Sequence, residues 1–134
     1  MSISTTALKV HLNIPFEDAI TQVTDALKMQ GFGVLTSIDM RATFKNKLHV
    51  DFRPYTILGA CNPLLAHQAV TTAPEVGLLL PCNVTVVQVD DATVEISFVD
   101  PVVMLGVVDA PGLHEVAGDV RAKFEAVIDY LNAE

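Results

Sequence analysis

The sequence predicts an α+β domain in which two long helices pack on one face of a curved, largely antiparallel sheet. Three observations lead to this fold class. An alternating strand pattern is followed directly by an amphipathic helix, strand-like segments fill the middle, and a second amphipathic helix closes the sequence. A chain of 134 residues with 51% hydrophobic side chains can enclose one core, so we expect a single domain over residues 1–134.

The first strand and the first helix have the clearest patterns. Leu8, Val10, Leu12 and Ile14 alternate with polar residues, as in a strand with one buried face. Apolar side chains then recur at helical spacing over residues 15–30, with a proline in the first turn and a glycine after the last one. These signals predict a strand that leads into a helix of about four turns.

Two further strands are expected over residues 33–39 and 55–60, which are short and rich in β-forming side chains. The segment between them, residues 40–51, fits helical and strand spacing equally well. We expect a helical turn through Lys47.

The second half of the sequence predicts a hairpin and a long helix. A short helix is expected over residues 63–70, followed by a buried connection or short strand over residues 76–81. The β-rich runs 83–89 and 93–99 flank a short polar segment, which favours antiparallel pairing. Apolar residues at helical spacing then mark a helix over residues 113–131.

The charge balance excludes some partners. The net charge of -8 would repel a phosphate backbone, so we expect no nucleic-acid partner. We also expect no membrane partner, because the longest apolar run is far too short for a spanning helix. The first residues lack the pattern of a secretory signal, which predicts a cytoplasmic protein. Charged residues make up only 18% of the chain, which leaves room for an apolar face that a second copy could cover, so we expect a homodimer.

Two similar segments carry the candidate site, Cys61-Asn62 and Cys82-Asn83, each at the junction of an apolar run with another element. Cys61 lies just before the helix that Pro63 begins, where free backbone N–H groups favour a reactive thiolate. Three interpretations remain open for the two thiols. They pack in the core, they form a reactive or redox site, or they bind a metal ion.

His67 is the remaining candidate in this region. With Cys61 and Cys82 it would supply three ligands for a divalent metal ion such as zinc, leaving a fourth position for water or substrate. The spacing is not the tight Cys-x-x-Cys pattern of a strong zinc motif, and a histidine on a helix surface or satisfied in the core is the more ordinary interpretation.

A family resemblance rests on the segments around these cysteines, above all on residues 55–63 and 77–84 with their two Cys-Asn pairs, together with Gly31-Phe32-Gly33, Ile38-Asp39 and Ala66-His67. Over residues 16–105 the chain resembles the family called domain of unknown function 302. The resemblance implies a β-α-β(4)-α arrangement, similar to the TATA-binding-protein-like class, and commonly a homodimer. It implies no activity, and fold alone does not transfer DNA binding.

These observations lead to two functional expectations. The first is a dimeric module that binds a small ligand near the Cys-Asn segments, through Cys61, Asn62, His67, Cys82 and Asn83. The alternative is a thiol- or metal-dependent enzyme that uses Cys61, Cys82 and His67. The sequence identifies neither a ligand nor a catalytic residue, and whether the protein is an enzyme stays open.

Overall fold

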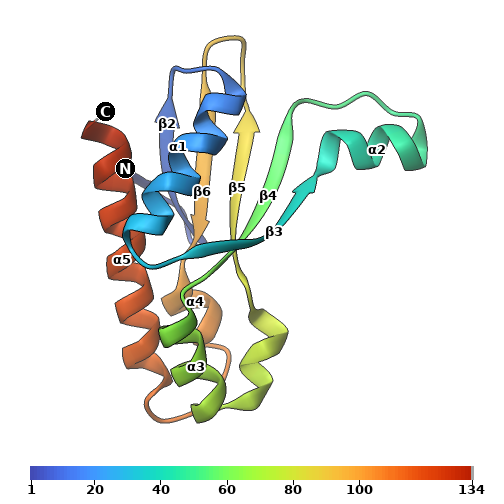
Figure 1. The fold of residues 1–134 in the computed structure, drawn as a ribbon. Coiled ribbons are helices and arrows are strands. Elements are labelled where there is room, and N and C mark those ends of the chain that lie inside the picture. Colours follow the sequence, from blue (N-terminus) through green and yellow to red (C-terminus); the bar gives the residue numbers. More distant parts are fainter. Residues whose placement is uncertain (134) are drawn as a thin grey trace.

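The computed structural model describes residues 1–133 and has an α+β fold with one six-stranded sheet. Every neighbouring pair of strands is antiparallel, in the order β1-β2-β6-β5-β4-β3. Figure 1 shows the two longest helices, α1 and α5, on the same side of the sheet. The elements are β1 (Ser2–Ile3), β2 (Ala7–Leu12), α1 (Phe16–Met29), β3 (Gly33–Asp39), α2 (Met40–Leu48), β4 (Tyr55–Cys61), α3 (Pro63–Thr72), η1 (Pro74–Leu79), β5 (Cys82–Gln88), β6 (Val94–Val99), α4 (Pro101–Leu105) and α5 (Leu113–Ala133).

This architecture confirms the predicted fold class. Strand β2, helix α1, the four strands β3 to β6 and helix α5 together form the β-α-β(4)-α arrangement that the resemblance implied. The expected helical turn after residue 40 is a helix of nine residues, α2, which the Asp39 side chain caps by accepting a hydrogen bond from Ala42 N at 2.9 Å. The hairpin is confirmed as β5 and β6, with Val86 opposite Ile96.

One of the two alternatives for the segment before β5, the short strand, is wrong. Residues 74–79 form a 3₁₀ helix, so the short strand considered for residues 76–81 does not exist. Pro74 starts the helix with a backbone angle that suits its first turn, and Val76 is fully buried there. Val76 is buried in this connection, whereas Leu78 is 86% exposed, so the run is neither a strand nor buried throughout.

The hydrophobic core lies between the inner face of the sheet and the helices. Along β6, Val94, Ile96 and Phe98 are all fully buried, and the residues between them are more exposed, as strand alternation requires. Phe124 of α5 stacks on Phe32 with ring centroids 4.9 Å apart and contacts Phe98 at 5.4 Å. This aromatic group fixes the long helix α5 against both β6 and the turn that leads into β3.

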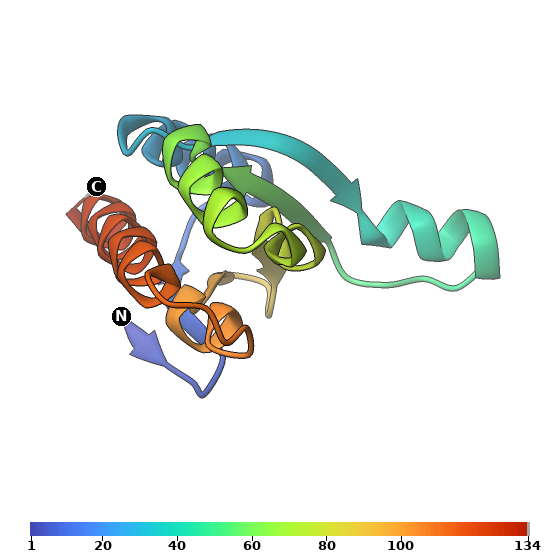
Figure 2. The same ribbon diagram turned by 90° about the horizontal axis from the view of Figure 1, so that it is seen from below.

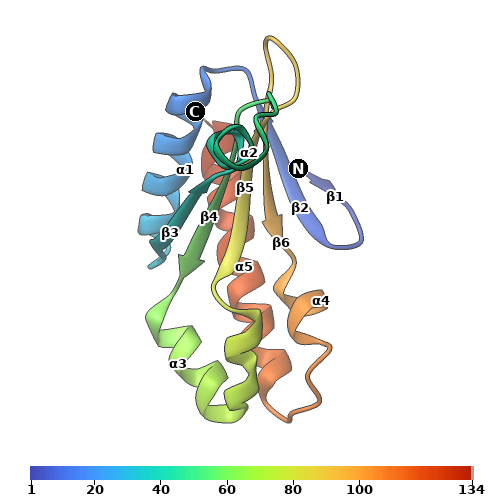
Figure 3. The ribbon, with the colours of Figure 1, turned by 90° about the vertical axis from the view of Figure 1, so that its right-hand side faces the viewer.

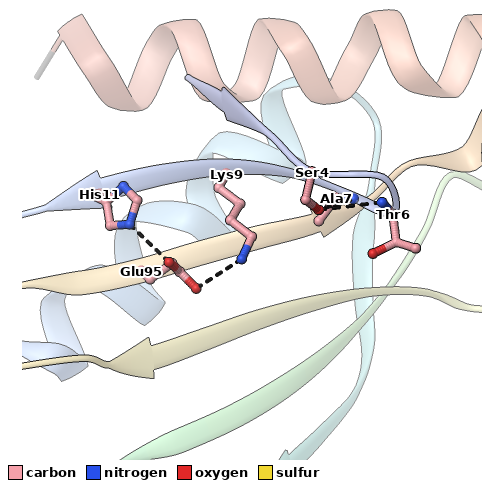
Figure 4. A network of polar contacts seen from close by, with 6 residues as sticks. All are labelled: Ser4, Thr6, Ala7, Lys9, His11 and Glu95. Carbon is pink, nitrogen blue, oxygen red and sulfur yellow. Dashed lines mark hydrogen bonds and ion pairs between the residues drawn. The ribbon is translucent and has the colours of Figure 1, made fainter.

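The outer face of the sheet has no long helix over it. Figure 3 looks onto this face, with α5 behind the sheet and α2 in front of it. On strands β2 and β6 the outer face is polar, because Glu95 pairs with His11 at 2.9 Å and with Lys9 at 3.5 Å (Figure 4). On β3 and β4 it carries apolar side chains, including Ile38 opposite Ile57.

Helix α2 and residues 49–54, together called the arm, project away from the rest of the molecule (Figures 1 and 2). No residue of α2 is buried, and the helix packs mainly on β3 and β4. Within the arm, Phe44 and Phe52 meet edge to face with their centroids 5.1 Å apart. The arm is thus held by its own aromatic contact and not by the central core.

Gly59 marks the tightest approach between neighbouring strands near the site. A Cβ atom at this position would meet the Thr36 hydroxyl and would lie 2.7 Å from Cγ of Pro81. We predict that Gly59→Ala lowers the free energy of unfolding by about 1–3 kcal/mol, because β3 and the Pro81 ring must shift to make room. Urea unfolding followed by circular dichroism measures this change.

Gly118→Ala, at an open position of α5, is the matched control and should instead stabilise the protein by about 0.5–1 kcal/mol. An equal effect of the two substitutions would contradict the packing argument.

Candidate functional site

The two cysteines lie at the same end of the sheet, although 20 residues separate them in the sequence. Cys61 ends β4 and Cys82 begins β5, and in an antiparallel pair the end of one strand lies beside the start of the next. The register places Ala60 directly opposite Cys82. Sheet pairing therefore brings the two cysteines close together at one end of the sheet, although strand alternation directs the side chain of Ala60, and not that of Cys61, to the same face as Cys82. Both cysteines are free.

Helix α3 begins two residues after Cys61, and Asn62 fixes the position of its first turn. The Asn62 side chain accepts a hydrogen bond from Leu65 N at 3.2 Å, which makes it the N-cap, and Pro63 takes the first helical position. The same amide donates to the Gln30 carbonyl at 3.2 Å. Gly31 follows with a φ of 83°, and a side chain there would approach the Asn62 amide to 3.0 Å. Asn62 thus ties the start of α3 to the end of α1.

A small cavity lies between the two cysteines and the helices. Cys61, Asn62 and Cys82 line it from the sheet side, and Leu65 of α3 and Val120 of α5 close it with apolar side chains. Its volume is about 20 Å³, which is enough for roughly one water molecule. A pocket for a drug-sized molecule needs about 300–1,000 Å³. In this conformation the cavity admits an ion or a single small group.

The two thiols differ in their surroundings. Cys82 is 5% exposed, whereas Cys61 is only partly buried at the end of its strand. Burial raises the pKa of the Cys82 thiol to about 11, and the negative charge of an ionised Cys61 adds to this increase. Cys82 is therefore a protonated, water-poor thiol at neutral pH, and Cys61 is the thiol that solvent reaches.

Two of the predicted site residues do not join the cysteines. His67 is exposed on α3 and does not line the cavity, because it lies on the side of the helix opposite the buried Leu65 and Ala69. Asn83 follows Cys82 in β5 and so points to the outer face of the sheet. There it lines a separate groove of about 280 Å³ with Pro81 and Met104. A single site that includes all five predicted residues is therefore wrong.

The three-ligand metal site is not assembled either. Residues 1–133 contain no group of three or more His, Cys, Asp or Glu side chains placed to hold one metal ion. The set Cys61, His67 and Cys82 fails because the helix turns the imidazole away from the sulfur atoms. A tetrahedral zinc site of the usual kind does not fit these side chains.

The arm is the feature that sequence reasoning missed. Of the eight Lys and Arg residues, four lie between Arg41 and Arg53, together with only one of the sixteen acidic residues. The arm also exposes apolar side chains, with Leu48 at 63% and Phe52 at 40%. The overall negative charge conceals this local excess of positive charge. A count of charges in a sliding window along the sequence would have revealed it.

No helix among the described residues combines the length and the continuous apolar character that crossing a bilayer requires.

The buried thiol makes the stability of the fold depend on pH. Unfolding exposes Cys82, whose thiol then has an ordinary pKa of about 8.5, so the unfolded chain loses this proton before the folded chain does. We predict that the free energy of unfolding falls as the pH rises from the unfolded-state pKa of about 8.5 to the folded-state pKa of about 11. The decline should be smaller in Cys82→Ala. Denaturant unfolding of both proteins across this pH range tests the prediction. Groups that titrate alike in the two proteins do not contribute to the difference between their unfolding free energies. Identical pH slopes would show that the Cys82 proton is not responsible.

Comparisons with known proteins agree with this architecture. The family model described as "Domain of unknown function DUF302" matches residues 8–131. A solved structure, the crystal structure of an uncharacterized conserved DUF302 protein from Bacillus stearothermophilus, superposes with a TM-score of 0.86 at 29% sequence identity. The similarity covers 94% of this chain and 98% of that one. A search of curated proteins found no match. Because the family model spans nearly the whole chain, the protein belongs to the DUF302 family, whose function is unknown.

Proposed function

We propose that this protein is a homodimeric binding module whose ligand site is the cavity between Cys61 and Cys82. The observation that carries the proposal is that two free cysteines from neighbouring strands both line one cavity beside α3. A few polar groups in the wall of a largely apolar cavity are typical of ligand sites. The small volume selects an ion, or the end of a molecule that enters beside Cys61.

Binding fits this cavity better than catalysis does. The described residues that line it include no carboxylate and no imidazole, and the two thiols are its only ionisable groups. Proton transfer in acid–base catalysis normally requires a side chain that titrates near the working pH. Thiol enzymes usually place such a group beside the nucleophile, and His67 does not fill that role.

The second half of the proposal is a dimer formed through the outer face of the sheet and the arm. Ile38, Leu48 and Phe52 are 46%, 63% and 40% exposed among the described residues. The arm is basic, whereas the rest of the chain is strongly acidic. In a two-fold symmetric dimer, the arm of each copy would approach the acidic body of the other. Charge complementarity thus favours a second copy of this chain as the partner.

A ligand at the cavity should stabilise the fold only when both thiols are present. We predict that a panel of metal ions and small metabolites contains one that raises the melting temperature, and that Cys61→Ala and Cys82→Ala abolish the increase. A ligand at 100 times its Kd should contribute about 2.7 kcal/mol. His67→Ala is the matched control, because His67 lies on the same segment but outside the cavity. Stabilisation that persists without both cysteines, or no stabilisation by any member of the panel, would refute a ligand site here.

The dimer should dissociate when charge is placed on the apolar arm. We predict that Leu48→Asp converts the protein to a monomer in sedimentation velocity, because a buried carboxylate would be unpaired at the interface. High salt should weaken the native dimer, since screening reduces the attraction between basic arm and acidic body. Leu64→Asp, at an equally exposed leucine of α3, is the control and should remain dimeric. A native protein that sediments as a monomer would overturn this half of the proposal.

A further inference from the structure

The outer face of the sheet carries a second hollow, separate from the inner cavity. A groove of about 280 Å³ lies where η1 leads into β5, beside β6 and α4. Leu78, Pro81, Val99 and Met104 line it, and Asn83 is the one polar side chain among the described residues that do so. Ligand pockets begin at roughly 300 Å³, so this groove is large enough to admit whole side chains.

The arm ends in a small apolar tip, residues 48–50. Helix α2 ends at Leu48, His49 adopts a left-handed φ of 57°, and the chain then turns back toward β4. Leu48 and Val50, on either side of this turn, are 63% and 48% exposed. Figures 1 and 2 show that the C-terminal end of α2 is the part of the arm farthest from the sheet.

We propose that the tip of the arm inserts into the groove of a second copy of this chain, and that two such contacts hold the dimer. This inference rests on the proposed dimer and names the surfaces that meet in it. The aliphatic side chains of the tip and the aliphatic wall of the groove would leave water together, which favours their association.

The positions of the arm and the groove suit a two-fold axis. The arm precedes Tyr55 at the start of β4, whereas Gly59, near the end of β4, lies opposite Asn83 of the groove. Figure 1 shows this separation, with α2 at the upper right and residues 74–79, in yellow-green, at the lower right. The arm projects away from its own groove. When two outer faces meet about an axis that crosses the strands, each tip faces the groove of the partner.

The distribution of charge favours the same pairing. Residues 54–120, which include the whole groove, contain eight Asp and Glu residues and no Lys or Arg. Glu75 lies in η1, the helix that contributes Leu78 to the groove. In the arm, Arg41 and Lys47 form no ion pair with any described residue. Their charges are therefore available to attract the acidic part of a second copy.

Sedimentation equilibrium of the full chain tests the groove. We expect Leu78→Asp to raise the Kd of the dimer by roughly 100-fold, because an unpaired carboxylate costs roughly tenfold at each of the two contacts. Leu78 is 86% exposed in the single chain, so the fold should persist, which circular dichroism verifies. Val107→Asp is the matched control, since Val107 is 75% exposed but lies outside the groove, and it should dimerise like the native protein.

A charge-pairing variant separates direct contact from an indirect effect. Leu48→Asp combined with Leu78→Lys should regain most of the affinity that Leu48→Asp loses, because each arm carboxylate would then meet an ammonium group in the groove of the partner. Leu48→Asp combined with Val107→Lys should regain none of it. Recovery specific to position 78 requires that the tip of one copy lies in the groove of the other.

A dimer that tolerates Leu78→Asp, or a charge-pairing variant that stays as weak as Leu48→Asp, would overturn the groove assignment. The proposed function fails in a different way. If the native protein is a monomer, the dimer itself falls, and this inference falls with it. If Leu48→Asp dissociates the dimer while Leu78→Asp does not, the dimer stands and only the groove is wrong.

Discussion

The pairing of β4 with β5 is the interaction on which the rest of the structure depends. Strand β5 is one of the two central strands, so that β3 and the arm attach to the sheet through β4, whereas β6, β2 and β1 lie on the other side of β5. Their register places Leu58 opposite Val84 on the buried face, where both meet the helices. A slip by one residue would turn these apolar side chains outward and would change which residue of β4 lies opposite Cys82. Core formation and site formation therefore depend on the same alignment.

The end of the sheet that carries the cavity is held by a buried polar contact. Asp100, only 3% exposed, caps α4 by accepting from Val102 N at 3.0 Å and accepts a second bond from Arg121 of α5 at 2.7 Å. Both interactions satisfy a carboxylate that would otherwise be costly to bury. Leu105 of α4 and Val120 of α5 form part of the cavity wall, so this contact keeps that wall in place.

The two faces of the sheet have different consequences for function. The inner face is covered by α1 and α5 and contains the core, whereas the outer face leaves apolar side chains of β3 and β4 beside a basic arm. An arm without buried residues contributes little to the stability of a monomer. The proposed dimer would cover the exposed apolar and basic side chains of the arm. Under the proposed function, the inner cavity would bind the ligand and the outer face would hold the second copy.

Much of this fold was determined by the sequence alone, because strand and helix patterns are local. Alternation at residues 8–14, helical spacing in α1 and α5, and the polar turn between β5 and β6 each act over a few residues. The same is true of Asn62 and Pro63, which mark the start of α3. The predicted neighbourhood of the two cysteines also held, because antiparallel pairing joins the end of one strand to the start of the next.

The composition of the site was decided only by the tertiary structure. Cys82 and Asn83 are adjacent in sequence, yet strand alternation sends them to opposite faces of the sheet. His67 lies near Cys61 in sequence, yet the rotation of α3 turns it to solvent. The cavity volume depends on how α3 and α5 close over the sheet, and the isolation of the arm depends on which elements fail to cover it. Such long-range packing leaves no local pattern, because it arises from residues that meet only after the chain has folded.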